Sequence, residues 1–289
     1  MPYPLDTQPF FDPVTNTVSY VTSDPGTMEC AIIDPVLDFD PRAGRLATHS
    51  AKSIVDYVQG HNLTTRWILE THVHADHLSA AEHLQKVLGG KIGIGHRITD
   101  VQRIFADVFN LKADFPVDGS QFDRLFHDGE TFTIGRIPAR VLHTPGHTPA
   151  CVTYLIGDAA FVGDALFMPD YGTARTDFPG GDARRLFRSI QRILALPSST
   201  RMFVGHDYGT PDRKRFAWET TVEEQRRANV HVGLGVDEDA FVLMRVNRDT
   251  TLEMPALILP SVQINIRAGR LPAPENNGVH YLKIPIGVL

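Results

Sequence analysis

Residues 71–77 of the chain read THVHADH and place four potential metal ligands, His72, His74, Asp76 and His77, in the pattern H-x-H-x-D-H. Imidazole and carboxylate groups at this density are hard to explain without a metal ion, because both are common metal ligands. Asp76 also has a plainer explanation, as the N-cap of a following helix. The segment therefore predicts a metal site.

The flanking sequence places this segment on a loop between a strand and a helix. Residues 66–70 predict a short buried strand. Residues 78–88 predict a helix, because leucine and alanine recur there at helical spacing and Gly89-Gly90 ends the run. Strand-to-helix loops are where α/β folds usually carry their chemistry, so we expect the ligands at one edge of a sheet.

The composition is that of an ordinary globular protein, with 42% hydrophobic and 21% charged residues among 289. A formal net charge of −6 favours no nucleic-acid partner. No apolar run is long enough to span a bilayer, and the first residues lack a signal-peptide pattern, so we expect no membrane partner. The two cysteines, Cys30 and Cys151, suit a reducing cytosol, where we expect both to be small buried residues. These features predict a cytoplasmic protein.

Strand and helix signals divide the chain into two β-rich halves, roughly residues 1–117 and 118–250, with an extended tail over residues 251–289. No short repeat or low-complexity linker separates the halves, so we predict one domain over residues 1–289. Strands are expected at residues 17–21, 29–35, 66–70, 131–134, 139–142, 152–156, 159–162 and 202–204. Helices are expected at residues 51–58, 78–88, 98–109, 182–194, 220–227 and 238–248.

Three further loops each offer a ligand beside a glycine, directly after a predicted strand. They contain Gly146-His147, Gly163-Asp164 and Gly205-His206. Glycine lets the backbone turn tightly and approach a metal ion closely. A lone histidine in a loop is usually a surface residue, but three such ligands at strand ends, added to the first segment, are poorly explained by chance.

This set of loops resembles the metallo-β-lactamase superfamily. The resemblance implies an α/β (α+β) fold, a four-layer αββα sandwich that binds metal between the loop edges of its two sheets. It implies one metal position surrounded by His72, His74, His147 and Asp164, and a second surrounded by Asp76, His77, Asp164 and His206. His143 is not at a family ligand position, and we expect it to be structural.

Local sequences within the superfamily are similar to persulfide dioxygenases. These are residues 71–77, 144–151, 163–167 and 175–178, while residues 170–181 and 254–261 resemble a bacterial subgroup. Asp164 disfavours a lactamase, because many lactam hydrolases carry cysteine there, and His74 disfavours flavodiiron proteins, which carry glutamate. The alternative is a dinuclear hydrolase of glutathione thioesters like glyoxalase II, but its Arg/Lys pattern is not recognisable after His206.

The resemblance implies a sulfur dioxygenase that oxidises glutathione persulfide, or a similar small thiol persulfide, with O₂ to sulfite and free thiol. His72, His147 and Asp164 would be its metal-binding and catalytic residues, holding one Fe(II) per subunit. Two His and one carboxylate leave one face of the metal open, as both reactants require. His74, Asp76, His77 and His206 would orient groups around the iron, or complete a site for two Zn in the hydrolase alternative.

Two further residues are candidates for binding the thiol. Arg175 could bind a carboxylate of glutathione, or it could brace its own loop by pairing with Asp177 or Asp170. Tyr208 could point its hydroxyl at the bound sulfur, or it could simply be a packed tyrosine. A homo-oligomer, dimer or tetramer, is the expectation from the family.

Overall fold

The computed structural model describes residues 4–111 and 115–288, so the ends of the predicted domain and tail at residues 1–3 and 289 lie outside it. The first half of the chain builds a six-stranded sheet in the order β1-β2-β3-β6-β8-β9. Strands β1 to β3 pair antiparallel, and β3, β6, β8 and β9 run parallel. Its strands are β1 (Asp6–Asp12), β2 (Thr17–Asp24), β3 (Glu29–Ile33), β6 (Thr64–Leu69), β8 (Lys91–Gly95) and β9 (Arg124–Phe126).

The second half builds another six-stranded sheet, whose strands follow one another in sequence order. Neighbouring strands pair antiparallel except β13 and β14, which are parallel. Its strands are β10 (Thr131–Ile134), β11 (Ile137–His143), β12 (Val152–Ile156), β13 (Ala159–Phe161), β14 (Arg201–Phe203) and β15 (Glu219–Thr221). A small third sheet contains β4 (Val36–Asp40), β5 (Arg45–Ala47) and β7 (Leu78–Ser79).

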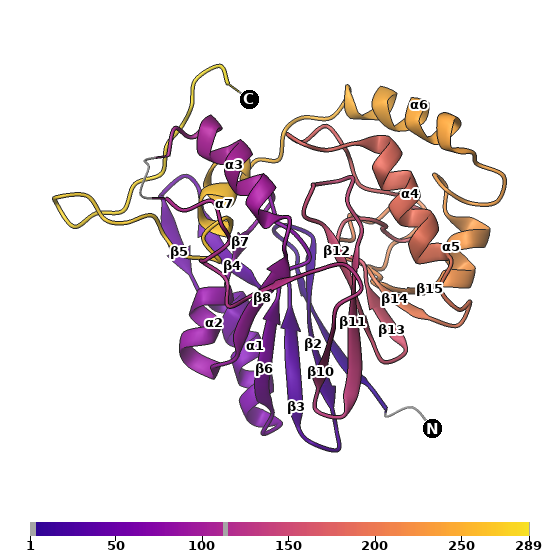
Figure 1. The fold of residues 1–289 in the computed structure, drawn as a ribbon, viewed down its shortest axis with the longest axis horizontal. Helices are drawn as coiled ribbons and strands as arrows, with labels where there is room; N and C mark the ends of the chain where they lie inside the picture. Colours follow the sequence, from indigo (N-terminus) through magenta and orange to yellow (C-terminus); the bar gives the residue numbers. More distant parts are fainter. Residues whose placement is uncertain (1–3, 112–114, 289) are drawn as a thin grey trace.

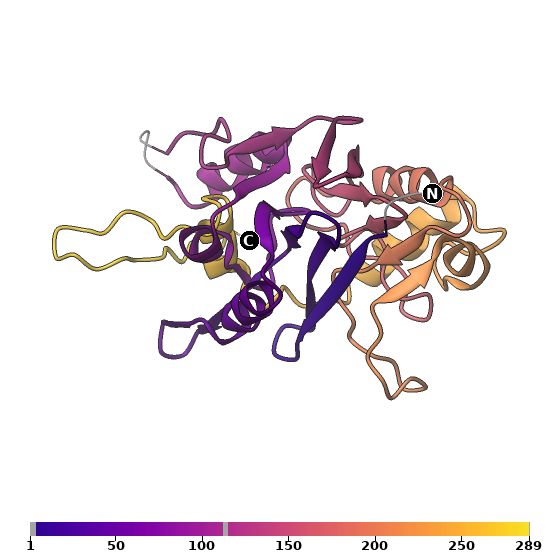
Figure 2. The ribbon, with the colours of Figure 1, turned by 90° about the horizontal axis from the view of Figure 1, so that it is seen from below.

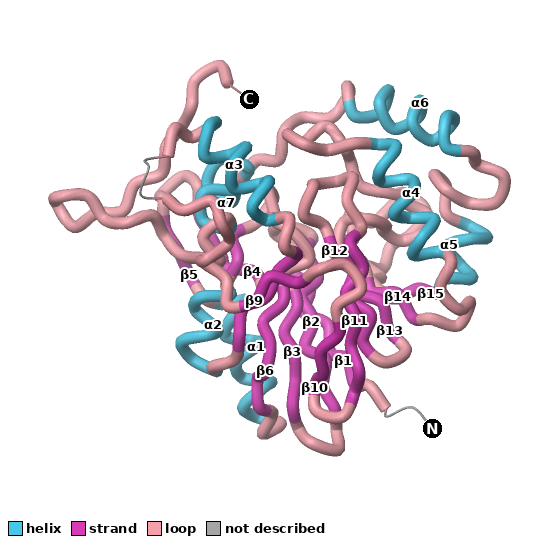
Figure 3. The backbone as a smooth tube through the Cα atoms, viewed as in Figure 1, coloured by secondary structure: helices cyan, strands magenta, loops and turns pink. Residues whose placement is uncertain are grey.

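The helices cover the outer faces of the two large sheets (Figures 1 and 3). The first sheet packs against α1 (His49–Gly60), α2 (Ala81–Leu88), α3 (Ile98–Val108) and α7 (Ile258–Asn265). The second packs against α4 (Ala183–Leu194), α5 (Val222–Ala228) and α6 (Glu238–Asp249). A further apolar cluster lies between the two sheets and includes Tyr20, Ile33, Tyr154 and Phe161. The order helices, sheet, sheet, helices confirms the predicted four-layer αββα fold class. Because both sheets contribute to the cluster between them, we propose a single domain.

Local sequence explains the ends of the clearest helices. Helix α4 begins after Asp182, whose carboxylate accepts a hydrogen bond from the Arg185 backbone N–H. Leu186 and Ile190 recur on its buried face, as the helical spacing predicts. Helix α5 begins with a capping box between Thr221 and Glu224.

The structure corrects several sequence expectations. β9 belongs to the first sheet, so the change between sheets falls between residues 126 and 131 rather than near residue 118. The predicted tail over residues 251–289 is not extended throughout, because it contains α7. From residue 271 onward the described tail has neither helix nor strand, and its loop projects from the body in both views (Figures 1 and 2).

The helix predicted from residue 78 begins at Ala81, because Leu78 and Ser79 instead pair with β4. Its N-cap is Ala80, so Asp76 does not cap this helix. Cys30 and Cys151 are both buried and free, as predicted for small core residues. Within the described residues, no helix is long and apolar enough to cross a membrane.

Candidate metal centre

The predicted ligand loops meet at one edge of the two sheets. Residues 70–77 follow β6, and Asp34 follows the parallel neighbour β3. In the second sheet His147, Asp164 and His206 follow β11, β13 and β14. Strand β13 is parallel to β14, and two antiparallel pairings make β11 parallel to them, so the carboxyl ends of all three lie at the same edge.

His72, His147 and Asp164 form the first group of potential ligands, with one ligand atom of each within 4.8 Å of the others. The Nε2 atoms of His72 and His147 lie 3.9 and 3.7 Å from Asp164 Oδ2. All three residues are buried. The structure therefore brings together the three residues that the family resemblance implies as metal ligands.

Hydrogen bonds fix the protonation of both imidazoles in a form that suits a metal. The Thr71 hydroxyl donates to Asp34 Oδ2 at 2.8 Å, so it can accept from His72 Nδ1, 2.9 Å away. His147 Nδ1 donates to the Arg175 carbonyl oxygen at 2.8 Å, because a carbonyl can only accept. Each ring then carries its proton on Nδ1 and presents the Nε2 lone pair to the site. The buried His72 Nε2 has no hydrogen-bond partner, as expected for a metal ligand.

Burial reinforces this state at His72. Removal from water, together with the neighbouring His74 and His147 rings, lowers the pKa of His72 well below its usual value. The neutral imidazole is the form that binds metal, so the environment favours ligation.

His74, Asp76 and His206 form a second group. His206 Nε2 lies 3.5 Å from Asp76 Oδ2 and 3.3 Å from Asp164 Oδ1. Asp164 therefore stands between the groups, with one carboxylate oxygen toward each. The buried His206 Nε2 and Asp164 Oδ1 lack hydrogen-bond partners. Atoms of this kind without partners are expected at a metal position, so the second group could also hold a metal ion.

His74 differs from the assignment implied by the resemblance, because its ligand atoms group with Asp76 and His206 rather than with His72. Its Nε2 contacts Asp34 Oδ1 at 3.0 Å and Glu70 Oε2 at 3.2 Å. Burial disfavours protonation of His74, but these carboxylates outweigh burial and raise its pKa well above the usual value. Nδ1 is the nitrogen without a partner, and metal binding there requires loss of its proton.

His77 is the one described member of the predicted set that joins neither group. Its Nδ1 lies 3.2 Å from Asp76 Oδ2 and 3.3 Å from the Thr17 hydroxyl. Burial opposes ionisation of Asp76, but the neighbouring His206 and His77 rings lower the pKa of that carboxyl well below its usual value. His77 thus orients Asp76 within the loop.

Asn265 is a site residue that sequence reasoning missed. Its side-chain amide lies on α7 and donates to the His74 and His77 carbonyl oxygens, both at 2.8 Å. Its Oδ1 accepts from the Ser79 backbone N–H at 2.8 Å. A single asparagine in a C-terminal segment carries no motif that could have identified it. Asp34 and Glu70 were also missed, although both end a predicted strand.

Two glycines allow the loops to approach each other. Gly163 has a positive φ of 50°, and a Cβ there would lie 2.5 Å from the Thr71 hydroxyl oxygen. A Cβ on Gly205 would lie 2.8 Å from Asp164 Oδ1. The glycines beside Asp164 and His206 therefore have a steric reason, as the sequence predicted.

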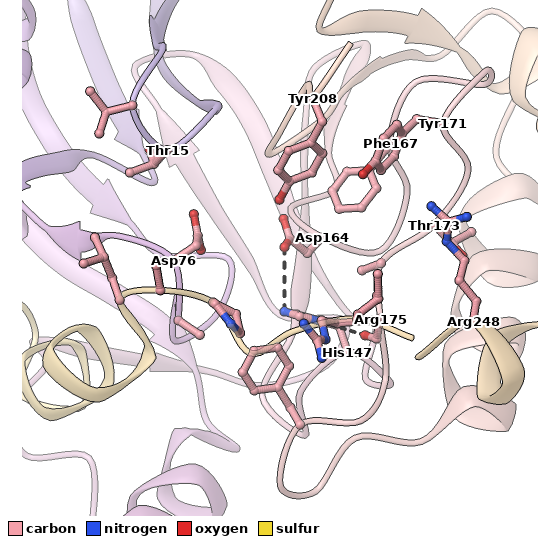
Figure 4. A pocket seen from close by; sticks show the side chains of 18 of the residues that line it. Thr15, Asp76, His147, Asp164, Phe167, Tyr171, Thr173, Arg175, Tyr208 and Arg248 are labelled. Atoms are coloured by element: carbon pink, nitrogen blue, oxygen red, sulfur yellow. Dashed lines mark hydrogen bonds and ion pairs between the residues drawn. The ribbon is translucent and has the colours of Figure 1, made fainter. Parts of the chain in front are cut away.

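The ligands open into a cavity of about 460 Å³, within the size range of small-molecule sites. Asp76, His147 and Asp164 line its floor, and Phe167, Tyr171, Phe178 and Tyr208 supply aromatic walls (Figure 4). A mostly apolar wall with a few polar groups suits a small ligand whose reacting end meets the metal.

Both predicted substrate-binding residues line this cavity. Arg175 pairs with Asp177 through two contacts of 2.6 Å, and its Nη1 donates to the Glu253 carbonyl oxygen at 2.6 Å. These are the contacts of the bracing alternative. Tyr208 stacks against His206 with ring centroids 5.5 Å apart, and its hydroxyl points toward Asp164 (Figure 4). Partial burial, Asp164 and Asp76 raise the pKa of Tyr208 well above its usual value, so the hydroxyl keeps its proton.

Comparisons with known proteins identify the family. A probable metallo-hydrolase of Burkholderia pseudomallei is 54% identical over 97% of this chain and 98% of its own length. A β-lactamase hydrolase-like protein of Agrobacterium fabrum is 56% identical, and the match covers 97% of this chain but 64% of that longer protein. The mitochondrial persulfide dioxygenase ETHE1 of Homo sapiens is 30% identical over 92% of this chain and 89% of its own length. The crystal structure of ETHE1 from Myxococcus xanthus matches with a TM-score of 0.73 and 28% identity, over 92% of this chain and 100% of that one.

The metallo-β-lactamase superfamily profile matches residues 12–206. This span begins at the end of β1 and includes all four loops that carry the two ligand groups, from His72 to His206. The fold, the ligand loops and these matches together show that the chain belongs to the metallo-β-lactamase superfamily.

Proposed function

We propose that the protein is an Fe(II)-dependent persulfide dioxygenase. The observation that carries the proposal is the buried group of His72, His147 and Asp164, in which hydrogen bonds hold two imidazoles ready to bind and one carboxylate completes a three-residue metal site. The similarity to persulfide dioxygenases, in sequence and in structure, supports the same reaction.

The reaction would convert glutathione persulfide, O₂ and water into glutathione, sulfite and two protons. The sulfur–sulfur bond breaks, the outer sulfur is oxidised to sulfite, and O₂ is reduced. Iron(II) held by the three residues would activate O₂ and offer open positions for both reactants, while the persulfide supplies the electrons that reduce O₂. The side chains around the metal position would provide the other requirements of the reaction.

The residues around the metal position would orient the substrate and exclude water. Thr71 and the Arg175 carbonyl hold the two imidazole rings in place. The aromatic side chains of Phe167 and Phe178 line the approach and would shelter the reactive sulfur from solvent. The Tyr208 hydroxyl, which keeps its proton, can donate a hydrogen bond to an anion beside Asp164.

A second candidate is a dinuclear hydrolase of glutathione thioesters, with two Zn ions. The position of Asp164 between the two ligand groups favours it, because a bridging carboxylate is suited to a pair of metals. The similarity to the Burkholderia protein named a probable metallo-hydrolase points the same way.

A paired assay separates the candidates. Protein purified without O₂ and loaded with iron is expected to consume O₂ with glutathione persulfide and release sulfite. Two zinc ions per chain, fast hydrolysis of S-lactoylglutathione and no O₂ uptake would establish the hydrolase instead.

Metal analysis of two variants gives a second test. Asp164→Ala is expected to abolish iron binding, whereas His206→Ala keeps the iron. Equal metal loss in both variants would indicate a dinuclear site.

The cytoplasmic location and the homo-oligomer, dimer or tetramer, stay predictions. Fractionation of the producing cell and light scattering of the purified protein measure them directly.

A further inference from the structure

Three arginines face the substrate cavity from one side, and two of them are already neutralised. Arg175 pairs with Asp177, as described above. Arg245 of α6 is buried, with its Nη2 2.7 Å from Asp249 Oδ1 and its Nη1 donating to the Thr173 carbonyl oxygen at 3.0 Å. Neither guanidinium is available to a ligand unless these contacts break.

Arg248 is the third arginine, and its charge has no such partner. It lies near the end of α6, lines the same cavity and is exposed. No hydrogen bond or ion pair joins its guanidinium to another described residue (Figure 4). The Asp177 and Asp249 carboxylates balance the charges of Arg175 and Arg245. The positive charge of Arg248 is therefore the one that stays unbalanced on this wall.

The rest of this wall suits the aliphatic part of a substrate. Leu252, Pro255 and Leu257 line the cavity together with Arg248. Figure 4 shows Arg248 set apart from His147 and Asp164, where the reacting sulfur would bind. A ligand that reaches from this metal position to Arg248 therefore meets an uncompensated cation at its far end.

We infer that Arg248 is a specificity-determining residue that binds a carboxylate of the thiol carrier, which makes an anionic thiol persulfide the preferred substrate. This inference rests on the proposed function. A guanidinium offers a planar pair of donors that matches a carboxylate. Of the two carboxylates of glutathione, the glycyl one fits better, because the other stands beside an ammonium group that Arg248 would repel.

The first test measures binding without turnover. Isothermal titration calorimetry of the metal-loaded protein with S-methylglutathione is expected to show affinity reduced on the order of tenfold in Arg248→Ala, the size of one charge-assisted hydrogen bond. Asn247→Ala is the matched control, because Asn247 is exposed beside Arg248 on α6 but does not line the cavity. Arg248→Lys should lie between the two, since it keeps the charge but loses the paired donors.

The second test uses turnover to identify the carboxylate. With glutathione persulfide, Arg248→Ala should raise KM on the order of tenfold, with kcat and metal content unchanged. When the glycyl carboxylate of the persulfide is esterified, the wild-type KM should already be high. Arg248→Ala should then raise KM little further, because the ester and the substitution remove the same contact.

The outcomes separate this inference from the proposed reaction. Unchanged S-methylglutathione affinity in Arg248→Ala, an equal loss in Asn247→Ala, or no binding by the wild-type protein would overturn it. An equal rise in KM for the parent and esterified persulfides would also overturn it. Weaker binding in Arg248→Ala alone, in a protein that consumes no O₂, would support the carboxylate contact and refute the dioxygenase reaction.

Discussion

The contact between α7 and the metal loop gives the sharpest test of how this site is held. Asn265→Leu replaces the amide with an apolar side chain of similar size and removes its three hydrogen bonds. The His74 and His77 carbonyl oxygens and the Ser79 N–H would then be buried without partners. We expect the variant to lose both stability and metal affinity.

The magnitude follows from these three groups. Each buried polar group without a partner costs about 1–3 kcal/mol, and partial relaxation of the loop reduces the sum. We therefore expect the free energy of unfolding of the metal-free protein to fall by about 4 kcal/mol, at the upper end for single substitutions. The two released carbonyl groups, of His74 and His77, lie in the loop that carries the potential ligands His74 and Asp76. Metal affinity should therefore fall about 10- to 100-fold, as for other residues that orient ligands.

The same helix provides a matched control. Gln263 is also buried on α7, but its amide donates to the Leu259 and Lys283 carbonyl oxygens and accepts from the Lys283 N–H. Gln263→Leu should destabilise the protein less than Asn265→Leu does, because the released backbone groups of the exposed Lys283 can bind water, and it should leave metal affinity unchanged. Urea unfolding measures stability, and competition with a chelator for Co(II), followed by its visible absorption, measures affinity and ligand geometry.

The comparison of the two variants can refute the reasoning. If Asn265→Leu keeps wild-type Co(II) affinity and absorption, as Gln263→Leu is expected to, the amide of Asn265 only supports the fold. An unchanged unfolding free energy in Asn265→Leu would show that the three hydrogen bonds carry no net stability.

Three further predictions concern single contacts near the site and between the sheets. Thr71→Val leaves the buried Nδ1–H of His72 without its acceptor, so metal affinity measured by chelator competition should fall about 10- to 100-fold. Gly205→Ala places a methyl group 2.8 Å from Asp164 Oδ1, and metal content measured by mass spectrometry should fall while the protein remains folded. Hydrogen bonds from Arg136, opposed by burial, lower the pKa of Asp24, so Asp24→Asn should cost about 2 kcal/mol at pH 7. This difference should persist above the unfolded carboxyl pKa of about 3.9 and shrink as the pH falls below it, which urea unfolding across pH measures.

Each of these predictions has a clear contrary result. Thr71→Ser keeps the hydroxyl and should behave like the wild type, and equal losses in the serine and valine variants would point to packing rather than hydrogen bonding. Full metal occupancy in Gly205→Ala would mean that the loop yields to the new methyl group. A stability difference for Asp24→Asn that grows toward low pH would contradict the sign of its pKa shift.

The ligand set was predictable because each ligand carries a local signal. His72, His147, Asp164 and His206 all follow a strand, and three of them stand beside a glycine. The hydrophobic pattern likewise predicted most strands of the second sheet and helix α4. These features depend on residues close together in sequence, which is what pattern analysis detects.

The missed features depend on distant contacts or weak local patterns. Strand β8 contains two glycines, which have low strand propensity, and β9 has only three residues. Helix α7 contains Pro260, and its buried residues do not fall on one face, so helical periodicity is absent. Asn265 is separated from His77 by 188 residues, and only the folded chain brings them together.

That separation also has a consequence for the order of events during biosynthesis. At about 5–20 residues per second, the ribosome makes Asn265 roughly 10 to 40 s after His77. During that interval the histidines of residues 72–77 lie on a loop that Asn265 does not yet hold, and His147, Asp164 and His206 are added before Asn265 is made. A tight metal site can therefore form only late in translation, which limits how long a partly made chain can trap whichever metal ion it meets first.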